Sequence, residues 1–315
     1  MEREKIKAVR SLSVIKQNDI VQRARYNLDL VQQKTLMYLI SKINSVKDIE
    51  FQEIEIDLKE LCEIMGITYS GRSLKDFQDA IKKMADKSLW VDTGNKIRLM
   101  RWLQRVDIDK GSTIITVRFD ELMAPYLLKI KDCFTEYRLE NVLPMKSQYS
   151  LRLYELLKSH SGQPKWEVSL EELKSQLFID NAPAYDRYDL FRQRVIDPAI
   201  LEIFNYTEMS AAYEPKRKDR KIVAITFYTC ECRGLSTERT RRNNNRATVL
   251  DNLSAKIVPP VKMPTVKEIQ EERIKQREAA ELKKLTDKYI RAKQPIDYTK
   301  PVDFMAGQST IDGLF

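Results

Sequence analysis

A short sequence pattern occurs twice in this chain of 315 residues, and it restricts the folds that the chain can adopt. Residues 56–67 align without gaps on residues 168–179. Each copy begins with a polar residue, Asp57 or Ser169, that is followed three positions later by glutamate. This capping box is typical of a helix start, where the two side chains satisfy free backbone N–H groups. Apolar residues then recur at helical spacing, so we expect one folding unit in two copies.

The repeat extends beyond these helices in both directions. The helical pattern of residues 33–39 is similar to that of residues 148–156, and residues 74–88 correspond to residues 188–204. Alternating patterns typical of strands follow, at residues 89–91, 97–106 and 113–119 in the first copy and at residues 208–213 and 222–229 in the second. A helix, a short strand, two helices and a β-hairpin are the elements of a winged helix. We therefore predict an α+β fold with two tandem winged-helix domains related by internal duplication, followed by a charged, partly helical C-terminal tail.

The extent of the periodic pattern predicts the domain boundaries. We expect a flexible N-terminal arm in residues 1–18, a first winged-helix domain in residues 19–130 and a second in residues 131–232. Residues 233–315 begin with a basic linker and continue as a highly charged segment in residues 266–293. Oppositely charged residues four positions apart favour a helix in that segment, and its apolar stripe is too thin to bury much area.

The scarce residue types exclude several classes of function. With one histidine, His160, the chain cannot form a multi-histidine metal site, and its four cysteines include no Cys-x-x-Cys pair. Its eight glycines form neither of the glycine-rich loops that hold nucleotide phosphates. No constellation of catalytic residues stands out. We therefore expect no metal, no cofactor and no enzymatic activity.

The charge balance favours a polyanionic partner. Lysine and arginine number 55 against 46 acidic residues, which gives a net charge of +9. No apolar run approaches the ~20 residues that span a bilayer, and the N-terminal residues lack the apolar core of a signal peptide. We therefore predict a cytoplasmic protein with reduced thiols that binds nucleic acid and not membranes.

The second copy has the stronger DNA-binding pattern. A helix-turn-helix reads bases with residues near the start of its second helix, here residues 188–204. Arginine can bind a guanine edge and glutamine an adenine edge, so we predict base contacts for Arg187, Arg192, Gln193 and Arg194. The tip of the next hairpin carries five basic residues that we expect on the DNA backbone: Lys216, Arg217, Lys218, Arg220 and Lys221. The alternative is that the polar and charged residues at the start of the helix form only a solvent-exposed helix face.

The first copy has a more balanced charge. Basic residues on its third helix alternate with aspartates, and further basic residues lie on its wing strands. We predict DNA backbone contacts for Arg72, Lys75 and Arg98. A role in pairing with another protein chain fits this mixed charge as well.

Three segments of the chain carry a family resemblance. They are Gln22-Arg-Ala-Arg-Tyr-Asn-Leu, Gln148-Tyr-Ser-Leu-Arg-Leu-Tyr-Glu-Leu-Leu-Lys and Phe191-Arg-Gln-Arg-Val-Ile-x-Pro-Ala with Glu202 after it. Together they resemble the Rep initiators of theta-replicating, iteron-bearing plasmids. The resemblance covers about residues 19–231, and the family fold of two tandem winged helices agrees with the repeat.

The resemblance implies a function in plasmid replication. The second domain would bind tandem repeats, called iterons, in double-stranded DNA at the replication origin. The first domain would contact DNA less specifically or form the dimer that represses the protein's own gene, in a monomer–dimer equilibrium. Initiation would proceed by opening of the origin and recruitment of the host replicative helicase and the host initiator. Arg187, Arg192, Gln193 and Arg194 match the base-reading helix of the family.

The C-terminal residues suggest a further partner. The pattern Gln-x-x-Ile-x-x-Leu-Phe at residues 308–315 resembles the short peptides by which replication proteins bind sliding clamps. Ile311, Leu314 and Phe315 would fill an apolar clamp pocket, and Gln308 would supply polar contacts.

Two other functions fit the same residues. One is a winged-helix transcriptional repressor without a role in replication. The other is an accessory protein tethered to a sliding clamp, with protein as its main partner.

Overall fold

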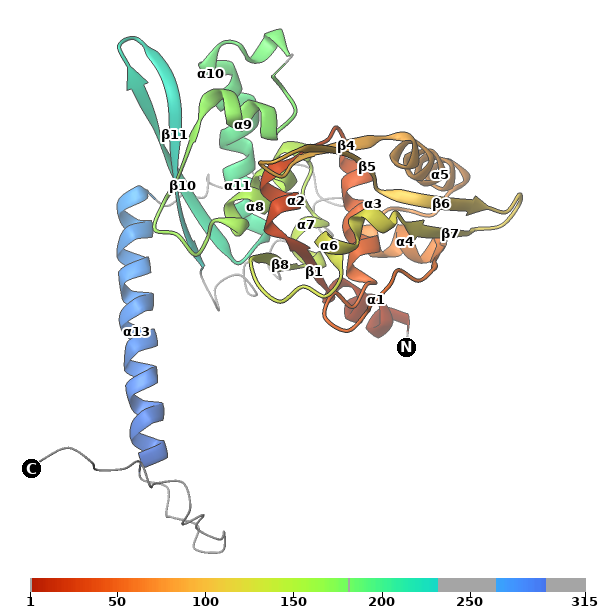
Figure 1. The fold of residues 1–315 in the computed structure, drawn as a ribbon, viewed down its shortest axis with the longest axis horizontal. Helices are drawn as coiled ribbons and strands as arrows, with labels where there is room; N and C mark the ends of the chain where they lie inside the picture. The colour runs from red at the N-terminus through yellow and green to blue at the C-terminus, as the bar shows by residue number, and fades with distance from the viewer. Residues whose placement is uncertain (1, 181, 232–264, 293–315) are drawn as a thin grey trace, which may run out of the picture. The chain divides into compact units, whose positions relative to one another are not determined.

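The computed structural model describes residues 2–180, 182–231 and 265–292. The chain divides into two units, Met1–Glu271 and Glu272–Phe315. The first unit contains both winged-helix domains (Figure 1). No helix in the described ranges is long and apolar enough to cross a membrane.

The first domain has the predicted order of elements. Helix α3 (Leu30–Ser41) is followed by strand β3 (Ile54–Asp57) and by helices α4 (Leu58–Met65) and α5 (Gly71–Asp86). Strands β6 (Leu103–Ile108) and β7 (Ile114–Phe119) then form the wing hairpin. All pairings are antiparallel, and β7 lies between β3 and β6 in a three-stranded sheet.

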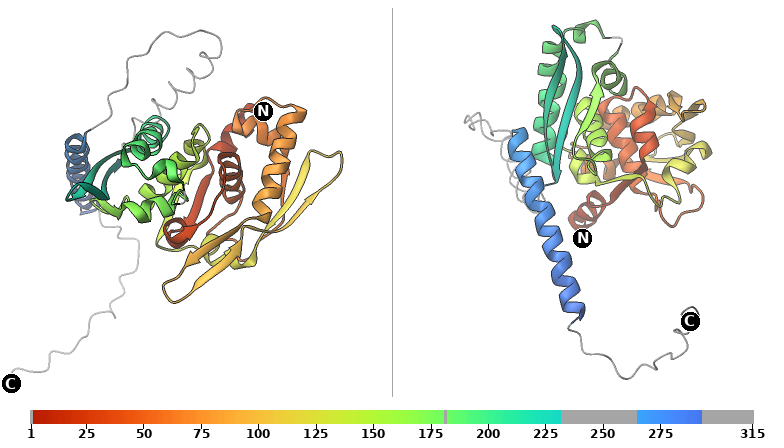
Figure 2. Two further views of the ribbon diagram at one scale, coloured as in Figure 1. Left: turned by 90° about the horizontal axis from the view of Figure 1, so that it is seen from above. Right: turned by 60° about the vertical axis from the view of Figure 1, so that its left-hand side comes forward.

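The strand expected at residues 97–106 is instead two strands in different sheets. Strand β5 (Ile97–Arg101) pairs with β4 (Ser88–Asp92), which pairs in turn with the short strand β2 (Ala24–Arg25). The chain bends at Trp102, whose side chain is buried and packs edge-on against Tyr26 at 5.2 Å between ring centres. The β4–β5 and β6–β7 hairpins therefore project separately from the domain (Figure 2).

The second domain repeats this topology. Helix α8 (Gln148–Ser159), strand β9 (Trp166–Ser169) and helix α9 (Leu170–Gln176) precede a helical region over residues 188–206. Strands β10 (Met209–Lys218) and β11 (Lys221–Glu231) form its wing, and β11 lies between β10 and β9. Because the second strand of each wing pairs with the strand before the helix-turn-helix, the two tandem winged helices are confirmed.

Both predicted helix caps form, but their glutamates have other partners. The Asp57 carboxylate accepts a hydrogen bond from the Lys59 backbone N–H, and the Ser169 hydroxyl accepts one from the Glu172 N–H at 3.1 Å. The glutamate side chains pair with distant cations, Glu60 with Lys5 and Glu172 with Arg25. Each glutamate therefore forms an ion pair with a distant residue in place of the hydrogen bond to the backbone N–H at its own helix start.

The expectation of a flexible N-terminal arm is wrong. Residues Glu2–Arg10 form helix α1, and the Arg10 guanidinium donates to the Ile64 carbonyl at the end of α4 at 2.9 Å. Strand β1 (Ser13–Gln17) pairs with β8 (Phe134–Arg138), which lies far away in the sequence. A strand of five residues whose partner lies so far along the chain has no local signal that would reveal it.

One apolar core extends through both domains. Leu36 and Leu39 of α3 and Leu153 and Leu156 of α8 are fully buried in the same cluster. A second, small apolar cluster is formed by Ile269 in the first turn of helix α13 (Val266–Ala292) with Ala212 and Cys230 on the wing strands. The folded first unit therefore includes the start of the charged helix.

Candidate nucleic-acid interface

The base-reading helix expected at residues 188–204 consists of three segments. Helix α10 (Tyr188–Phe191) leads into a π-helical turn, η3 (Arg192–Ile196), and then into α11 (Asp197–Tyr206). Pro198 causes the wider turn, because its ring nitrogen has no hydrogen to donate to the preceding turn. The N–H of Asp197, the residue before this proline, donates to the Arg192 carbonyl five residues earlier, as in a π-helix.

The π-helical turn presents the predicted base-contacting side chains to solvent. Arg192, Gln193 and Arg194 are all exposed, whereas the next two residues are buried. The side chains of Gln193 and Arg194 have no hydrogen-bond or ion-pair partner within the described part of the chain. These two residues are therefore free to bind another molecule.

The other two predicted base contacts are already paired with carboxylates. Arg187 binds Asp189 at 2.7 Å and lowers the pKa of that carboxyl group. Arg192 lies 3.7 Å from Asp197, whose carboxylate also accepts a hydrogen bond from the Tyr213 hydroxyl on β10. Burial and this hydrogen bond to Asp197 raise the pKa of Tyr213.

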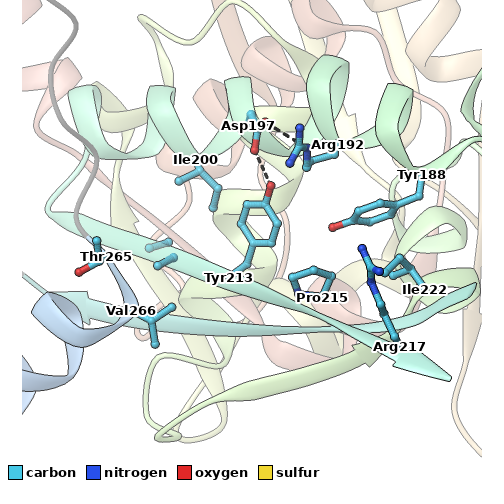
Figure 3. Close-up of a pocket in the computed structure, with 12 residues that line it drawn as sticks. Tyr188, Arg192, Asp197, Ile200, Tyr213, Pro215, Arg217, Ile222, Thr265 and Val266 are labelled. Carbon is cyan, nitrogen blue, oxygen red and sulfur yellow. Dashed lines mark hydrogen bonds and ion pairs between the residues drawn. The ribbon is translucent and has the colours of Figure 1, made fainter. Parts of the chain in front are cut away.

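A groove of about 420 Å³ lies between the helix and the wing (Figure 3). Tyr188 and Arg217 approach one end of it from opposite sides, and the Arg192–Asp197–Tyr213 cluster lines its middle. The Tyr188 hydroxyl has no hydrogen-bond partner among the described residues. The groove is therefore lined by two guanidinium groups, of which that of Arg192 is paired with Asp197, and guanidinium groups bind DNA phosphates.

The wing carries the predicted basic cluster at its tip. Lys216, Arg217, Lys218, Arg220 and Lys221 are all exposed. The hairpin reverses at Asp219 in a left-handed conformation with φ of 55°, which short polar residues such as aspartate tolerate. Lys216 is paired with Glu167 of β9 at 2.5 Å and lowers the pKa of that carboxyl group. The other four basic residues have no ion pair within the described ranges and form the positive surface of the tip.

The first domain also has a groove, of about 530 Å³, between helix α5 and the turn of its wing. Lys75 and Lys82 of α5 line it together with Asp79, opposite the wing turn at Gly111. Gly111 has a φ of 84°, which a residue with a side chain rarely adopts. Each groove therefore contains one aspartate, but the cations are lysines in the first domain and arginines in the second.

The structure does not bring the three predicted backbone contacts of the first domain together. Lys75 lies in the groove, and Arg72 is exposed on the first turn of the same helix. Arg98 lies on β5, in a different sheet from the wing, so it is not part of the wing as we expected. Its backbone contact stays a prediction, as do the other predicted contacts.

The remaining site predictions concern metals and the clamp peptide. Within the described ranges, no group of three or more histidine, cysteine, aspartate or glutamate residues could hold a metal ion. His160 stacks on Trp166 at 4.6 Å between ring centres. The predicted clamp-binding residues Gln308, Ile311, Leu314 and Phe315 lie outside the described residues.

Sequence reasoning missed Tyr188, Asp197 and Tyr213. The Asp197-Pro198 pair was the available signal, because an Asp-Pro pair inside a helical pattern favours a local break. Tyr213 had no such signal, since it meets Asp197 only when the wing folds back on the helix.

Comparison with known proteins identifies the family of the chain. Residues 13–158 match the family described as "Initiator Replication protein, WH1", and residues 169–229 match the one described as "Initiator Rep protein, WH2". A "Replication initiation protein" of Escherichia coli is 31% identical over 103 residues, or 31% of this chain and 32% of that protein. The Escherichia coli "PI protein" is 29% identical over 147 residues, or 42% of this chain and 47% of that protein. The chain thus matches less than half the length of either relative.

A solved structure has the same fold. The crystal structure of Pi initiator protein in complex with iteron DNA superposes with a TM-score of 0.59 at 20% identity, and the match covers 69% of this chain and 96% of that chain. Two matched domain families cover the two winged helices, and the fold agrees with them. The chain therefore belongs to the Rep family of DNA-binding replication initiator proteins.

Proposed function

We propose that this protein initiates plasmid replication by binding tandem repeats in double-stranded DNA at the origin. The observation that carries the proposal is a pair of grooves within one folded unit, each between the wing of a winged helix and the helical region before it. The family supports it, as does the fold shared with an initiator that was crystallised on iteron DNA.

The second domain supplies sequence recognition in this proposal. Gln193 and Arg194 contact base edges, because their side chains are exposed and have no partner in the described structure. Arg187 and Arg192 contact bases after leaving Asp189 and Asp197. The wing tip and Arg217 hold the adjacent phosphates.

The first domain supplies contacts of lower specificity. Lys75 and Lys82 neutralise phosphates beside their groove, where Asp79 limits the positive charge. The same domain forms the dimer that represses the gene. Strand β5 is the edge of its sheet, and the exposed side chains of Trp90, Ile97 and Leu99 on this hairpin offer an apolar surface to a second copy.

The later steps involve proteins of the host. Bound to its repeats in the cytoplasm, the protein opens the origin and recruits the host helicase and initiator, and residues 308–315 bind the sliding clamp. It uses no cofactor and catalyses no reaction. Removal of residues 308–315 should leave origin binding intact and weaken the capture of purified clamp.

Fluorescence anisotropy tests the central proposal. The full chain is titrated with DNA from the plasmid region around its gene and with scrambled DNA of equal length, at about 200 mM salt, where binding to phosphates alone is weak. Tight binding that requires the repeats is the expected result. Equal, weak binding to both DNAs would contradict the proposal.

A replication assay separates the initiator from a repressor that has the same fold. A selectable DNA circle carrying the cloned origin is introduced into cells with and without the gene supplied in trans. The proposal requires replication only when the gene is present. Replication that does not depend on the gene would leave binding and repression as the function.

A further inference from the structure

Two of the three segments that carry the family resemblance meet at the interface between the domains. Helices α8 and α9 of the second domain enclose residues 22–26 of the first. The Arg152 guanidinium on α8 is 4% exposed. It donates to the Ala24 carbonyl at 3.0 Å, to the Tyr26 hydroxyl at 3.1 Å and to the Gln176 carbonyl at 3.1 Å. One side chain thus joins β2, the chain after it and the end of α9.

A second buried charge lies one turn along α8. Glu155 is fully buried and pairs with the ammonium group of Lys16, which is 2% exposed on β1. The Tyr137 hydroxyl on β8 donates to the same carboxylate oxygen at 2.5 Å. Arg152 lies 3.7 Å from the other carboxylate oxygen of Glu155. The four groups form one buried network of two cations, one carboxylate and one hydroxyl group.

Partly exposed contacts surround this network. Arg25 pairs with Glu172 on α9 and donates to the Ser175 hydroxyl at 3.1 Å. The Gln176 amide donates to the Gln22 carbonyl at 3.1 Å, and the Gln22 amide donates to the Ser159 hydroxyl at 3.2 Å. The segment over residues 22–26 is therefore bound along its whole length.

The network lies one element away from each recognition helix. Ala24 in β2 pairs with Val91 in β4, and β4 directly follows α5. On the other side, α9 precedes the helical region over residues 188–206, with the short 3-10 helix η2 (Pro183–Tyr185) between them, and α8 packs against α11. A displacement at the interface would therefore change the relation between the two recognition helices.

The chemistry of the interface favours a single arrangement. Apolar surfaces can slide past one another at low cost, but buried charges must keep their partners, because a buried charge left alone is strongly unfavourable. Any rotation of one domain against the other would separate Arg152 from Ala24 or Glu172 from Arg25. Intermediate orientations are thus disfavoured.

We propose that Arg152, Glu155, Lys16 and the Arg25–Glu172 pair form an interdomain latch that fixes the distance and angle between the two recognition helices. These are positioning residues that do not touch DNA. This inference rests on the proposed function, since it assumes that both grooves contact one DNA. Its consequence is that the protein accepts only one spacing between the two DNA segments that it contacts.

The first test measures the arrangement of the domains without DNA. Spin labels are placed at exposed positions 76 on α5 and 223 on β11 through an unnatural amino acid, because a thiol label would also react with the exposed Cys133. Pulsed electron paramagnetic resonance then gives the distribution of distances between the two labels in the full chain. We expect a narrow distribution in the wild type and a broader one in the Arg152→Met and Glu172→Gln variants.

The control variant is Glu121→Gln. It breaks the Arg118–Glu121 pair inside the first domain and, like Glu172→Gln, removes one glutamate charge of about half exposure, 51% against 46%. We expect its distribution to match that of the wild type. If Arg152→Met does not fold, the milder Glu172→Gln still decides the result, because its polar side chain keeps the helix start intact. Unchanged distributions in the folded latch variants would overturn the proposal.

The second test uses DNA spacing. Five base pairs are inserted between the two contacted segments of the bound repeat, which turns one segment by about half a helical turn. We expect about tenfold weaker binding by the wild type and by Glu121→Gln. The latch variants should bind the uninterrupted repeat less tightly but lose about threefold or less on insertion, because their domains can reorient.

The outcomes of the two tests are distinct. Latch variants as sensitive to the insertion as the wild type would overturn the latch, as would a wild type that tolerates the insertion. A wild type that binds no repeat at all would contradict the proposed function instead, and the distance measurement would still decide for or against the latch.

Discussion

Arg194→Ala is the sharpest test of base recognition. The Arg194 side chain is exposed on the π-helical turn and has no partner within the described residues, so the folded protein loses no internal contact in the variant. A bidentate contact between arginine and guanine contributes about 1–3 kcal/mol of discrimination between sequences. The variant should therefore bind the repeat about 5-fold to 150-fold less tightly.

Arg192→Ala should have a smaller effect. Arg192 must leave Asp197, 3.7 Å away, before it can bind a base. The two side chains are 54% and 38% exposed, and a pair of this exposure contributes about 0–1 kcal/mol. The binding free energy lost in Arg192→Ala should therefore be smaller than that lost in Arg194→Ala by about this amount.

Arg220→Ala at the wing tip is the matched control. It removes the same charge from a position that we assign to phosphate, so binding to repeat and scrambled DNA should weaken equally. Anisotropy titrations of the three variants on both DNAs, repeated over a range of salt, give the comparison. If Arg194→Ala lost equal affinity on both DNAs, the assignment of this helix to base reading would be refuted.

Three further predictions concern the folded state. Burial lowers the pKa of His160 below its usual 6.5 in the folded state. Between 6.5 and that lowered value the unfolded chain binds more protons than the folded chain, so the free energy of unfolding falls as the pH drops. Urea unfolding at pH 7.5 and 5.5 should show this loss in the wild type and a smaller loss in His160→Gln. Gly66 ends α4 with a φ of 70°, so Gly66→Ala should lower the free energy of unfolding by about 1–2 kcal/mol. An unchanged melting temperature in this variant would contradict that reason. Leu153→Ala opens a cavity in the shared core and should cost about 2–5 kcal/mol in the same unfolding assay, unlike a substitution at exposed Leu201.

The repeat was enough to predict both winged helices, because capping residues and helical spacing are local signals. Local signals also located the wing tip between Lys216 and Lys221. They failed at Trp102, where a pattern of continuous alternation is interrupted by a side chain that turns into the core. The split into two sheets depends on β2 and β3, which lie far from this strand in the sequence.

The charged residues of α8 show a second limit. In the sequence, Arg152 and Glu155 carry the family resemblance without any sign of what they contact. Both are buried, and their partners Ala24, Tyr26 and Lys16 lie more than a hundred residues earlier. Charge alone favours an exposed position, so only the folded chain shows that these two side chains are buried and bind residues 16–26.

The docking of Ile269 on the wing strands determines where a minimal DNA-binding fragment must end. A fragment cut after β11, at residue 231, would uncover Ala212 and Cys230, which are 8% and 4% exposed in the folded chain. The newly accessible thiol would react with alkylating reagents and could crosslink two fragments. A fragment that ends at residue 271 retains the first turn of α13 and keeps Cys230 protected, so its alkylation rate reports whether the wing has kept its native support.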